Sequence, residues 1–261
     1  MTQGLVEFEF DLPGALLKEL ISVLASTEPA PLLPANLNTI PEQQGVYQLL
    51  LKKNDDYELV YIGKTDAEAG LSKRLQRHYK KIQHRRGISP EDVFFKAVRV
   101  FVFTVADLET DLIKHYGGVS SVPWNGSGFG SNDPGRKRDT SDYKEGHFDS
   151  MYPIDVGLEL EGIELPADGS AAEILKCLKM FLPYTLRYET ISGRSLQPHP
   201  DLEATKVELP PHVTWTALEI LETVVENLPP GWHATKLPSH IIMYKNDTRN
   251  ISSGIRLAFS G

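Results

Sequence analysis

The chain has 261 residues, of which 41% are hydrophobic and 24% are charged, and its formal net charge is −8. This composition is typical of a globular protein with one large domain or two of ordinary size. No run of about 18 apolar residues occurs, so we expect no membrane-spanning helix. The single cysteine excludes an internal disulfide and a cysteine-based zinc site. The first residues lack the features of a signal peptide, and we expect a cytoplasmic protein.

The N-terminal part predicts a helix, a linker and a hairpin, in that order. Asp11 and Pro13 are typical of a helix start, and apolar residues follow at helical period to residue 26. The segment 26–44 contains four prolines and predicts a linker. The next two apolar runs, 45–51 and 58–63, flank an Asn-Asp-Asp turn. This pattern predicts an antiparallel hairpin.

A basic helix is predicted from Leu71 to about Arg86, with an apolar stripe at intervals of three and four residues. Residues 73–86 carry seven Lys or Arg, two His and no acid. A solvated amphipathic helix would explain the stripe, but no acidic neighbour offsets the repulsion between the like charges. We therefore expect an anionic, phosphate-bearing partner. The spacing places on one face of the helix Arg74, His78, Lys81 and Arg85.

The following segment predicts a strand at 94–105 and a helix at 107–118 that ends in two glycines. Glu109 lies beside the apolar stripe of that helix and has no Lys three or four residues later. A carboxylate in such a place can bind a hard divalent metal, although the spacing alone also fits a partly exposed glutamate. A long polar loop follows, and it begins with Trp124 and Asn125.

From about residue 151 we predict a separate α+β domain. It includes a strand at 154–165, a strand at 240–245, and two helices with capping-box sequences that begin at Ser170 and Thr216. His233 and His240 have no metal-ligand spacing and are interpreted as loop or surface residues. The predicted domains are 1–44 (N-terminal helix and linker), 45–150, and 151–261.

Five short segments, taken in order, resemble the GIY-YIG nuclease superfamily. They are GVY at 45–47, YIG at 61–63, RLQRH at 74–78, LETDLIKHY at 108–116 and WN at 124–125. Val46 stands where this family usually has isoleucine. Within the superfamily, the segments LSKRLQRHYKKI and PWNGSGFGSNDPGR resemble the type II restriction endonuclease branch that cuts CCGCGG.

The resemblance implies an α/β (α+β) fold, in which a central three-stranded antiparallel sheet is flanked by helices. It also implies catalytic roles. Tyr47 and Tyr61, which could otherwise be simple core residues, would face a shared water, with Tyr47 or His78 as the general base. Arg74 would neutralise the phosphate. Glu109 would hold one Mg²⁺, which Mn²⁺ could replace, and Asn125 would orient the phosphate or Glu109.

Contacts with double-stranded DNA are expected from the basic helix and from the polar loop. Arg136 and Arg138 would either read guanine in the major groove or touch only the backbone. Cleavage of both strands of a symmetric site suggests a homodimer or a higher homo-oligomer. The domain 151–261 would supply either the oligomer contact or a further DNA contact. The remaining phosphate contacts are expected from Lys64, Lys73, Arg77, Lys80, Lys81, Arg85 and Arg86.

The expected function is that of a metal-dependent type II restriction endonuclease that cuts DNA at a short, GC-rich palindromic site. The sequence contains no helicase or ATPase motif, so no nucleotide cofactor is expected. Two alternatives stay open. One is a structure-specific repair, recombination or homing nuclease on the same core, and the other is a DNA-binding protein that does not cleave.

Overall fold

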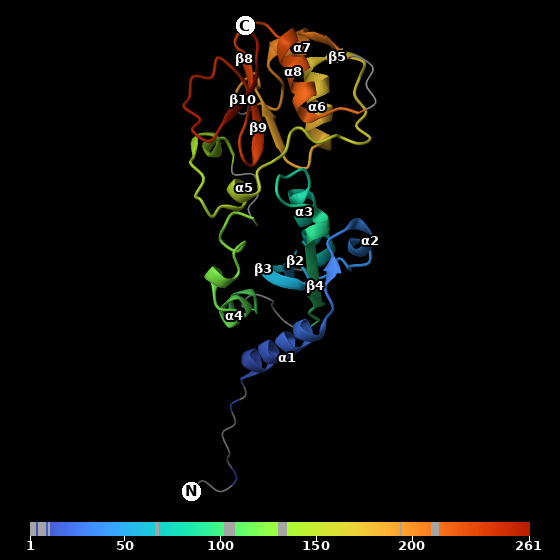
Figure 1. Ribbon diagram of the computed structural model, residues 1–261, viewed down its shortest axis with the longest axis vertical. Helices are drawn as coiled ribbons and strands as arrows, with labels where there is room; N and C mark the ends of the chain where they lie inside the picture. Colours follow the sequence, from blue (N-terminus) through green and yellow to red (C-terminus); the bar gives the residue numbers. More distant parts are fainter. Residues whose placement is uncertain are drawn as a thin grey trace. The chain divides into compact units, whose positions relative to one another are not determined.

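The computed structural model describes residues 4, 9, 11–65, 68–101, 108–129, 135–193, 195–209 and 214–261 (Figure 1). The contacts divide the chain into two compact units. The first comprises Met1–Tyr79 and Pro90–Gly126, and the second comprises Lys80–Ser89 and Ser127–Gly261. Each unit contains helices and a sheet, so the chain has mixed α and β structure. Residues 127–150, predicted as part of the domain that begins at residue 45, pack within the second unit.

A four-stranded antiparallel sheet forms the centre of the first unit. Its strand β2 (Gly45–Lys53) pairs with β3 (Asp56–Thr65) on one side and with β4 (Val93–Arg99) on the other. The expected three central strands are therefore present. The segment predicted as a linker adds β1 (Ala30–Pro31), which pairs with β4, and the short helix α2 (Pro34–Leu37).

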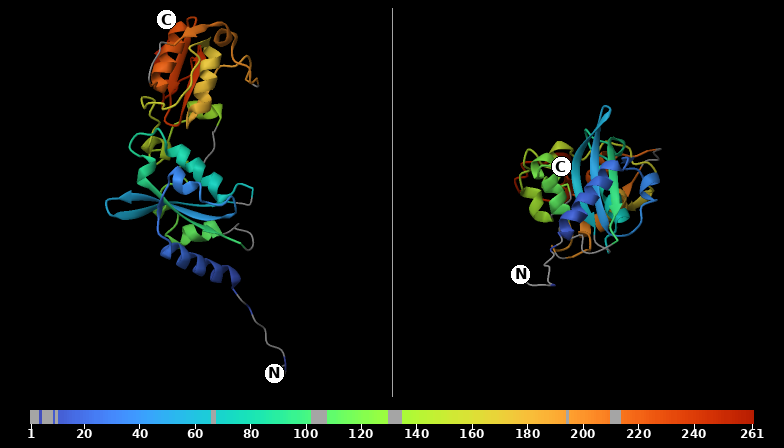
Figure 2. Two further views of the ribbon diagram at one scale, coloured as in Figure 1. Left: turned by 90° about the vertical axis from the view of Figure 1, so that its right-hand side faces the viewer. Right: turned by 90° about the horizontal axis from the view of Figure 1, so that it is seen from below.

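Helices cover both faces of this sheet, as the left view of Figure 2 shows. On one face, α1 (Leu12–Ser26) and α4 (Leu108–His115) pack against Val46 and Ile62. On the other face lies α3 (Leu71–Ile82). Alternate residues of a strand point to opposite faces, so the neighbours Tyr47 and Tyr61 point toward α3. Two 3₁₀ turns complete the unit, at Pro90–Asp92 and Val119–Ser121.

Several predicted boundaries are shifted by local backbone geometry. The basic helix ends at Ile82 rather than near Arg86, because His84 has φ of 53° and so leaves the right-handed helical region. The helix α4 ends before Gly117 and Gly118, which have φ of 95° and 83°. The predicted strand at 94–105 ends at Arg99, and its residues 102–105 lie outside the described ranges.

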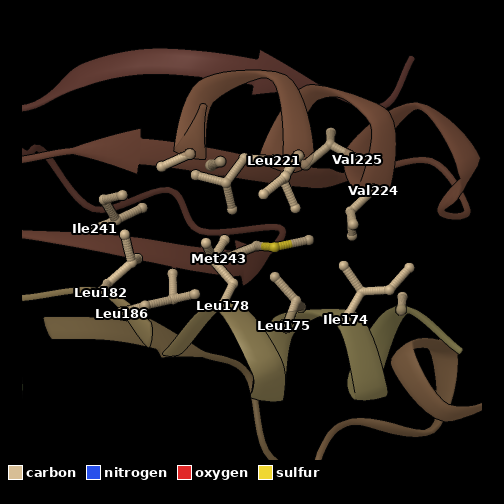
Figure 3. Close-up of a cluster of buried hydrophobic side chains, with 14 of the residues drawn as sticks. Ile174, Leu175, Leu178, Leu182, Leu186, Leu221, Val224, Val225, Ile241 and Met243 are labelled. Atoms are coloured by element: carbon tan, nitrogen blue, oxygen red, sulfur yellow. The ribbon is translucent and has the colours of Figure 1, made fainter. Parts of the chain in front are cut away.

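The second unit contains a mixed four-stranded sheet in the order β10-β8-β9-β6, in which only β6 and β9 are parallel. Two helices pack on one face of it, and Figure 3 shows their side chains meeting those of the sheet. The helices are α6 (Ala171–Phe181) and α8 (Ala217–Asn227). The strands are β6 (Thr185–Tyr188), β8 (Trp232–Lys236), β9 (His240–Lys245) and β10 (Ile255–Phe259).

Both predicted capping boxes are confirmed, at Ser170 with Glu173 and at Thr216 with Glu219. The predicted strand at 154–165 is wrong. This segment makes only isolated bridges and turns, and it is interrupted by two glycines, one of which, Gly162, has φ of 77°. The remaining elements are η3 (Arg136–Thr140), α5 (Phe148–Met151), α7 (Pro200–Ala204), and the paired strands β5 (Asp168–Ser170) and β7 (Lys206–Glu208).

None of the helices in the described ranges has the length and apolar character that crossing a lipid bilayer requires.

Candidate active site

Two tyrosines from the central hairpin pack together beneath α3. The register of β2 and β3 places Tyr47 opposite Gly63 and Leu49 opposite Tyr61, so both rings lie on the same face of the sheet. The ring centroids of Tyr47 and Tyr61 are 6.1 Å apart. Both rings are buried. The two tyrosines therefore belong to the core of the unit and also bring their hydroxyl groups to one place.

Gly45 of the GVY segment and Gly63 of the YIG segment are needed because neighbouring atoms approach both of them closely. A methyl group on Gly63 would overlap the Cζ and hydroxyl of Tyr47, whose ring crosses the backbone at that point. A methyl group on Gly45 would overlap the backbone oxygen of Val98 in β4 and the side chain of Leu71 in α3. Neither glycine has a positive φ, so the constraint is steric rather than conformational.

Two side chains of α3 contact the Tyr47 hydroxyl. Arg74 and His78 are four residues apart and therefore project from the same face of the helix. The Tyr47 oxygen lies 2.7 Å from His78 Nε2, and Arg74 Nε donates to that oxygen over 3.3 Å. The His78 ring also lies against Tyr61, with ring centroids 5.2 Å apart. Because the arginine occupies the phenol oxygen as an acceptor, the hydroxyl is well placed to donate its own proton to His78 Nε2.

The local environment disfavours a free phenolate at Tyr47. Burial raises the pKa of Tyr47 far above its usual value, and the neighbouring Tyr61 raises it further, whereas Arg74 acts in the opposite direction. The phenol therefore keeps its proton near neutral pH. It can accept a proton from another molecule only as it passes its own to His78.

Glu109 lies in the first turn of α4, where the helix dipole favours a carboxylate. Partial burial raises the pKa of Glu109, and the positive charges of Lys64 and Arg74 oppose that rise. Arg74 therefore interacts electrostatically with Glu109 and directly with Tyr47, and so it links the carboxylate to the tyrosine pair.

The residues fit a hard divalent ion held by a single protein carboxylate. Mg²⁺ is commonly bound through one or two carboxylates, with water and substrate phosphate supplying the other ligands. Glu109 is half-buried and electrostatically coupled to the polar cluster, as such a ligand would be. Within the described ranges, no group of three or more His, Cys, Asp or Glu side chains could form a closed metal site.

Asn125 has a different position from the one expected. Its side-chain amide donates to the carbonyl oxygen of Ile62 over 2.9 Å and accepts from the Ile62 N–H over 2.8 Å. The adjacent Trp124 N–H donates to the carbonyl oxygen of Val60 over 2.8 Å. Because β3 is the edge strand of the sheet, Asn125 and Trp124 satisfy its open backbone groups. Asn125 thus fixes the strand that carries Tyr61 and Gly63, and its amide is not left to orient a phosphate or Glu109.

Two of the expected DNA contacts instead bind groups within the second unit. Arg85 donates to Asp149 Oδ1 over 2.8 Å, and the two side chains are only 3% and 7% exposed. The position of Arg85 is a correction to the sequence prediction, since a buried and paired cation has no open side for a phosphate. Lys81 is half-buried; its Nζ donates to the carbonyl oxygen of Gly128 over 2.9 Å and lies over the ring of Phe148.

The other predicted contacts of the basic segment lie at the surface. Lys73 makes an exposed ion pair with Glu42, and Arg86 makes one with Asp155. Exposed pairs of this kind are weak, so a phosphate can replace the carboxylate. Arg77 and Lys80 are exposed as well. Lys64, which precedes the basic segment, is half-exposed.

The polar loop places its two arginines on aromatic rings. The guanidinium of Arg136 lies 5.1 Å from the ring centroid of Tyr244, and that of Arg138 lies 4.1 Å from that of Tyr143. Arg138 Nη2 also lies 2.8 Å from His147 Nε2. The partners of this loop lie far away in the sequence and were not predicted. His233 and His240, interpreted as loop or surface residues, are buried in β8 and β9, and His240 lies beside Asp139. The available local signal was Asp139 itself, the acid that directly follows the basic residues 136–138.

No protein-family model matches the chain, and no protein of curated function matches its sequence.

Proposed function

We propose that the first unit is a nuclease domain of the GIY-YIG type that hydrolyses DNA phosphodiesters with Tyr47, Arg74, His78 and Glu109. The single observation that carries the proposal is the hydrogen-bonded contact of the Tyr47 hydroxyl with both His78 and Arg74. The half-buried carboxylate of Glu109 is coupled to the same arginine. In the proposal, His78 is the proton acceptor, Arg74 is the phosphate ligand and Glu109 is the metal ligand.

The proposed proton path runs through the tyrosine to the histidine. A water molecule that attacks phosphorus gives its proton to the Tyr47 oxygen as the tyrosine passes its own proton to His78 Nε2. This relay avoids a free phenolate, which the raised pKa of Tyr47 makes unfavourable. His78 is therefore the final proton acceptor in the proposal, and Tyr47 is the group that touches the water.

The remaining roles follow from charge. Arg74 is half-buried, and its guanidinium provides donors for the non-bridging phosphate oxygens, whose negative charge increases at the transition state. Glu109 would hold a divalent ion, and Mg²⁺ bound there would stabilise charge on the phosphate and on the leaving 3′ oxygen. Tyr61 supports the ring of Tyr47 and the imidazole of His78. The leaving 3′ oxygen takes a proton from solvent water as the P–O3′ bond breaks, so the products of the proposed reaction are a 5′ phosphate and a 3′ hydroxyl.

We further propose that cleavage is specific for a short, GC-rich palindrome, as in type II restriction endonucleases. The support for this finer assignment is the order of the five sequence segments and the basic, exposed residues that follow the catalytic part of α3. A homodimer would present two such sites to the two strands of a symmetric target.

Incubation of supercoiled plasmid with the protein and Mg²⁺ tests the proposal. Discrete fragments with a common terminal sequence, a 5′ phosphate and a 3′ hydroxyl are the expected result. Nicking confined to branches or flaps would indicate a structure-specific nuclease instead. Plasmid that is bound but intact at every Mg²⁺ and Mn²⁺ concentration would contradict the catalytic assignment.

A further inference from the structure

The sheet of the second unit has a face that is not covered by α6 and α8. Along β9, Ile241 and Met243 join the core beneath these helices, so His240 and Tyr244 point to the opposite face. On β6, Leu186 likewise joins the core and Arg187 points away from it. The 3₁₀ helix η3 contacts this second face through Asp139.

Asp139 is an internal anchor for η3. Its side chain has no exposed surface, and Oδ1 lies 2.8 Å from His240 Nε2 and forms an ion pair with Arg187. The hydroxyl of Tyr244 donates to Oδ2 over 3.3 Å. Burial alone would raise the pKa of Asp139, but the hydrogen bond from His240 and the charge of Arg187 bring it below its usual value. The Asp139 carboxylate therefore stays ionised, and both of its oxygens are paired with side chains of the second unit.

Because Asp139 is paired inside the unit, it does not neutralise the exposed cations of η3 near Tyr244. Arg136 and Arg249 both lie over the ring of Tyr244, with distances of 5.1 Å and 5.2 Å to its centroid. Arg249 donates two hydrogen bonds to Asp247 and also makes an ion pair with Asp139 at 3.7 Å, so its charge is compensated within the unit. Arg136 and Lys137 are exposed and have no anionic partner among the residues that the structure describes.

This arrangement suits an anion that approaches η3 from solvent. The charge of Arg249 is compensated by Asp247 and Asp139, whereas the charges of Arg136 and Lys137 remain available to an incoming anion. A guanidinium that stacks on an aromatic ring keeps the N–H groups of its edge available for a phosphate fork. The overall charge of −8 makes such a local cationic surface unusual for this chain.

We propose that Arg136 and Lys137, presented by the Asp139 anchor and the ring of Tyr244, form a second phosphate-binding surface for duplex DNA on the second unit. The choice of DNA among polyanions rests on the proposed function. The surface contacts the backbone and does not read bases. Arg138, the other arginine of η3, has its guanidinium on Tyr143 and against His147.

The test is the salt dependence of duplex binding by the full-length protein without Mg²⁺, so that no cleavage occurs. The variant is Arg136→Gln/Lys137→Gln. The matched control is Lys176→Gln/Lys206→Gln, which removes two charges from exposed lysines of α6 and β7 in the same unit. Each phosphate contact contributes about 0.9 to the slope of log K against log salt. We expect the slope to decrease by roughly 1.8 in the variant and to stay unchanged in the control.

An equal slope in the variant and the control would overturn the inference, and so would wild-type protein that does not bind duplex at low salt. A changed set of plasmid cleavage sites with an unchanged slope would also overturn it, because that result indicates base reading. Failure of the nuclease proposal is seen separately, as intact plasmid in the presence of Mg²⁺. Loss of slope in the variant supports the surface whether or not the plasmid is cut.

Discussion

At the scale of single residues, the hydroxyl of Tyr47 is the group on which the proposed chemistry depends. Its oxygen contacts Arg74 and His78, while its ring is enclosed by the sheet, Tyr61 and α3. The hydroxyl and the ring can therefore be separated by mutation, because Phe keeps the ring and removes only the oxygen.

Tyr47→Phe is expected to lower the rate of plasmid cleavage by about 10²–10⁴-fold, the usual contribution of a positioned acid–base group. DNA affinity should change little, since Arg74 and the surface cations are retained. Tyr57→Phe is the control, because that ring packs on Phe94, outside the cluster. Cleavage by Tyr47→Phe at the control rate would remove Tyr47 from the proposed mechanism.

Gly63 tests the packing that holds the Tyr47 ring. In Gly63→Ala the new methyl group collides with the ring edge of Tyr47, so the phenol must move away from His78. We expect at least a tenfold loss of cleavage, with a far-ultraviolet circular dichroism spectrum like that of the wild type. Gly146→Ala adds the same methyl group where no atom lies within 4 Å, and it should be neutral for cleavage.

The pH dependence of Mg²⁺ binding should report Glu109, which must be ionised to bind a metal. Partial burial raises the pKa of Glu109, so Mg²⁺ affinity should fall with decreasing pH at a higher pH than for an ordinary glutamate. Lys64 opposes that rise, and Lys64→Met should therefore move the acidic midpoint upward. Lys73→Met, which removes an exposed charge paired with Glu42, serves as the control. A downward movement in Lys64→Met would contradict this electrostatic account.

At the scale of elements, the basic segment 73–86 divides into parts with different tasks. Arg74 and His78 contact the tyrosine of the first unit, and Lys81 and Arg85 stabilise the interior of the second. The charge density that suggested a DNA-binding helix is thus partly structural.

Arg85→Ala should destabilise the second unit by about 3–5 kcal/mol, because it leaves the buried carboxylate of Asp149 without its partner. Arg86→Ala is the matched control. Its side chain is 61% exposed, and we expect a loss of less than about 1 kcal/mol. Chemical denaturation of the two variants measures the difference. Similar stability of both would show that the Arg85–Asp149 pair contributes little.

Local sequence signals predicted many of the elements but not their long-range partners. The capping boxes at Ser170 and Thr216 and the hairpin around Asn54 depend on neighbouring residues, and the structure contains all three. The use of the Asn125 amide by Ile62 depends on residues 63 positions apart in sequence, which no local pattern reveals. For the same reason, the ion pair of Arg85 with Asp149 was not predictable.

The candidate site was predictable to a similar extent. The helical spacing of four residues placed Arg74 and His78 on one face, and the hairpin brought Tyr47 and Tyr61 to one side of the sheet. The sequence could not show that the Tyr47 hydroxyl is buried, and burial decides its protonation. Nor could the sequence show that the Asp139 side chain is buried in the second unit. There it pairs with His240, and the neighbouring cations of η3 stay exposed.

At the scale of the whole molecule, charge is distributed unevenly. The chain carries an excess of eight negative charges, yet cations are concentrated along α3 and at η3. A negative overall charge opposes nonspecific association with DNA. A local cationic surface can still attract DNA at that place. The proposed binding of DNA should therefore weaken steeply with added salt, even though the protein as a whole is acidic.

The most direct measurement of the central claim is plasmid cleavage by Glu109→Gln in saturating Mg²⁺, together with its duplex affinity. The account predicts no detectable cleavage, with an affinity within a few-fold of the wild type, because the variant keeps the cations and loses only the proposed metal ligand. Cleavage by Glu109→Gln at the wild-type rate would contradict the assignment of a metal-dependent phosphodiesterase site to this cluster.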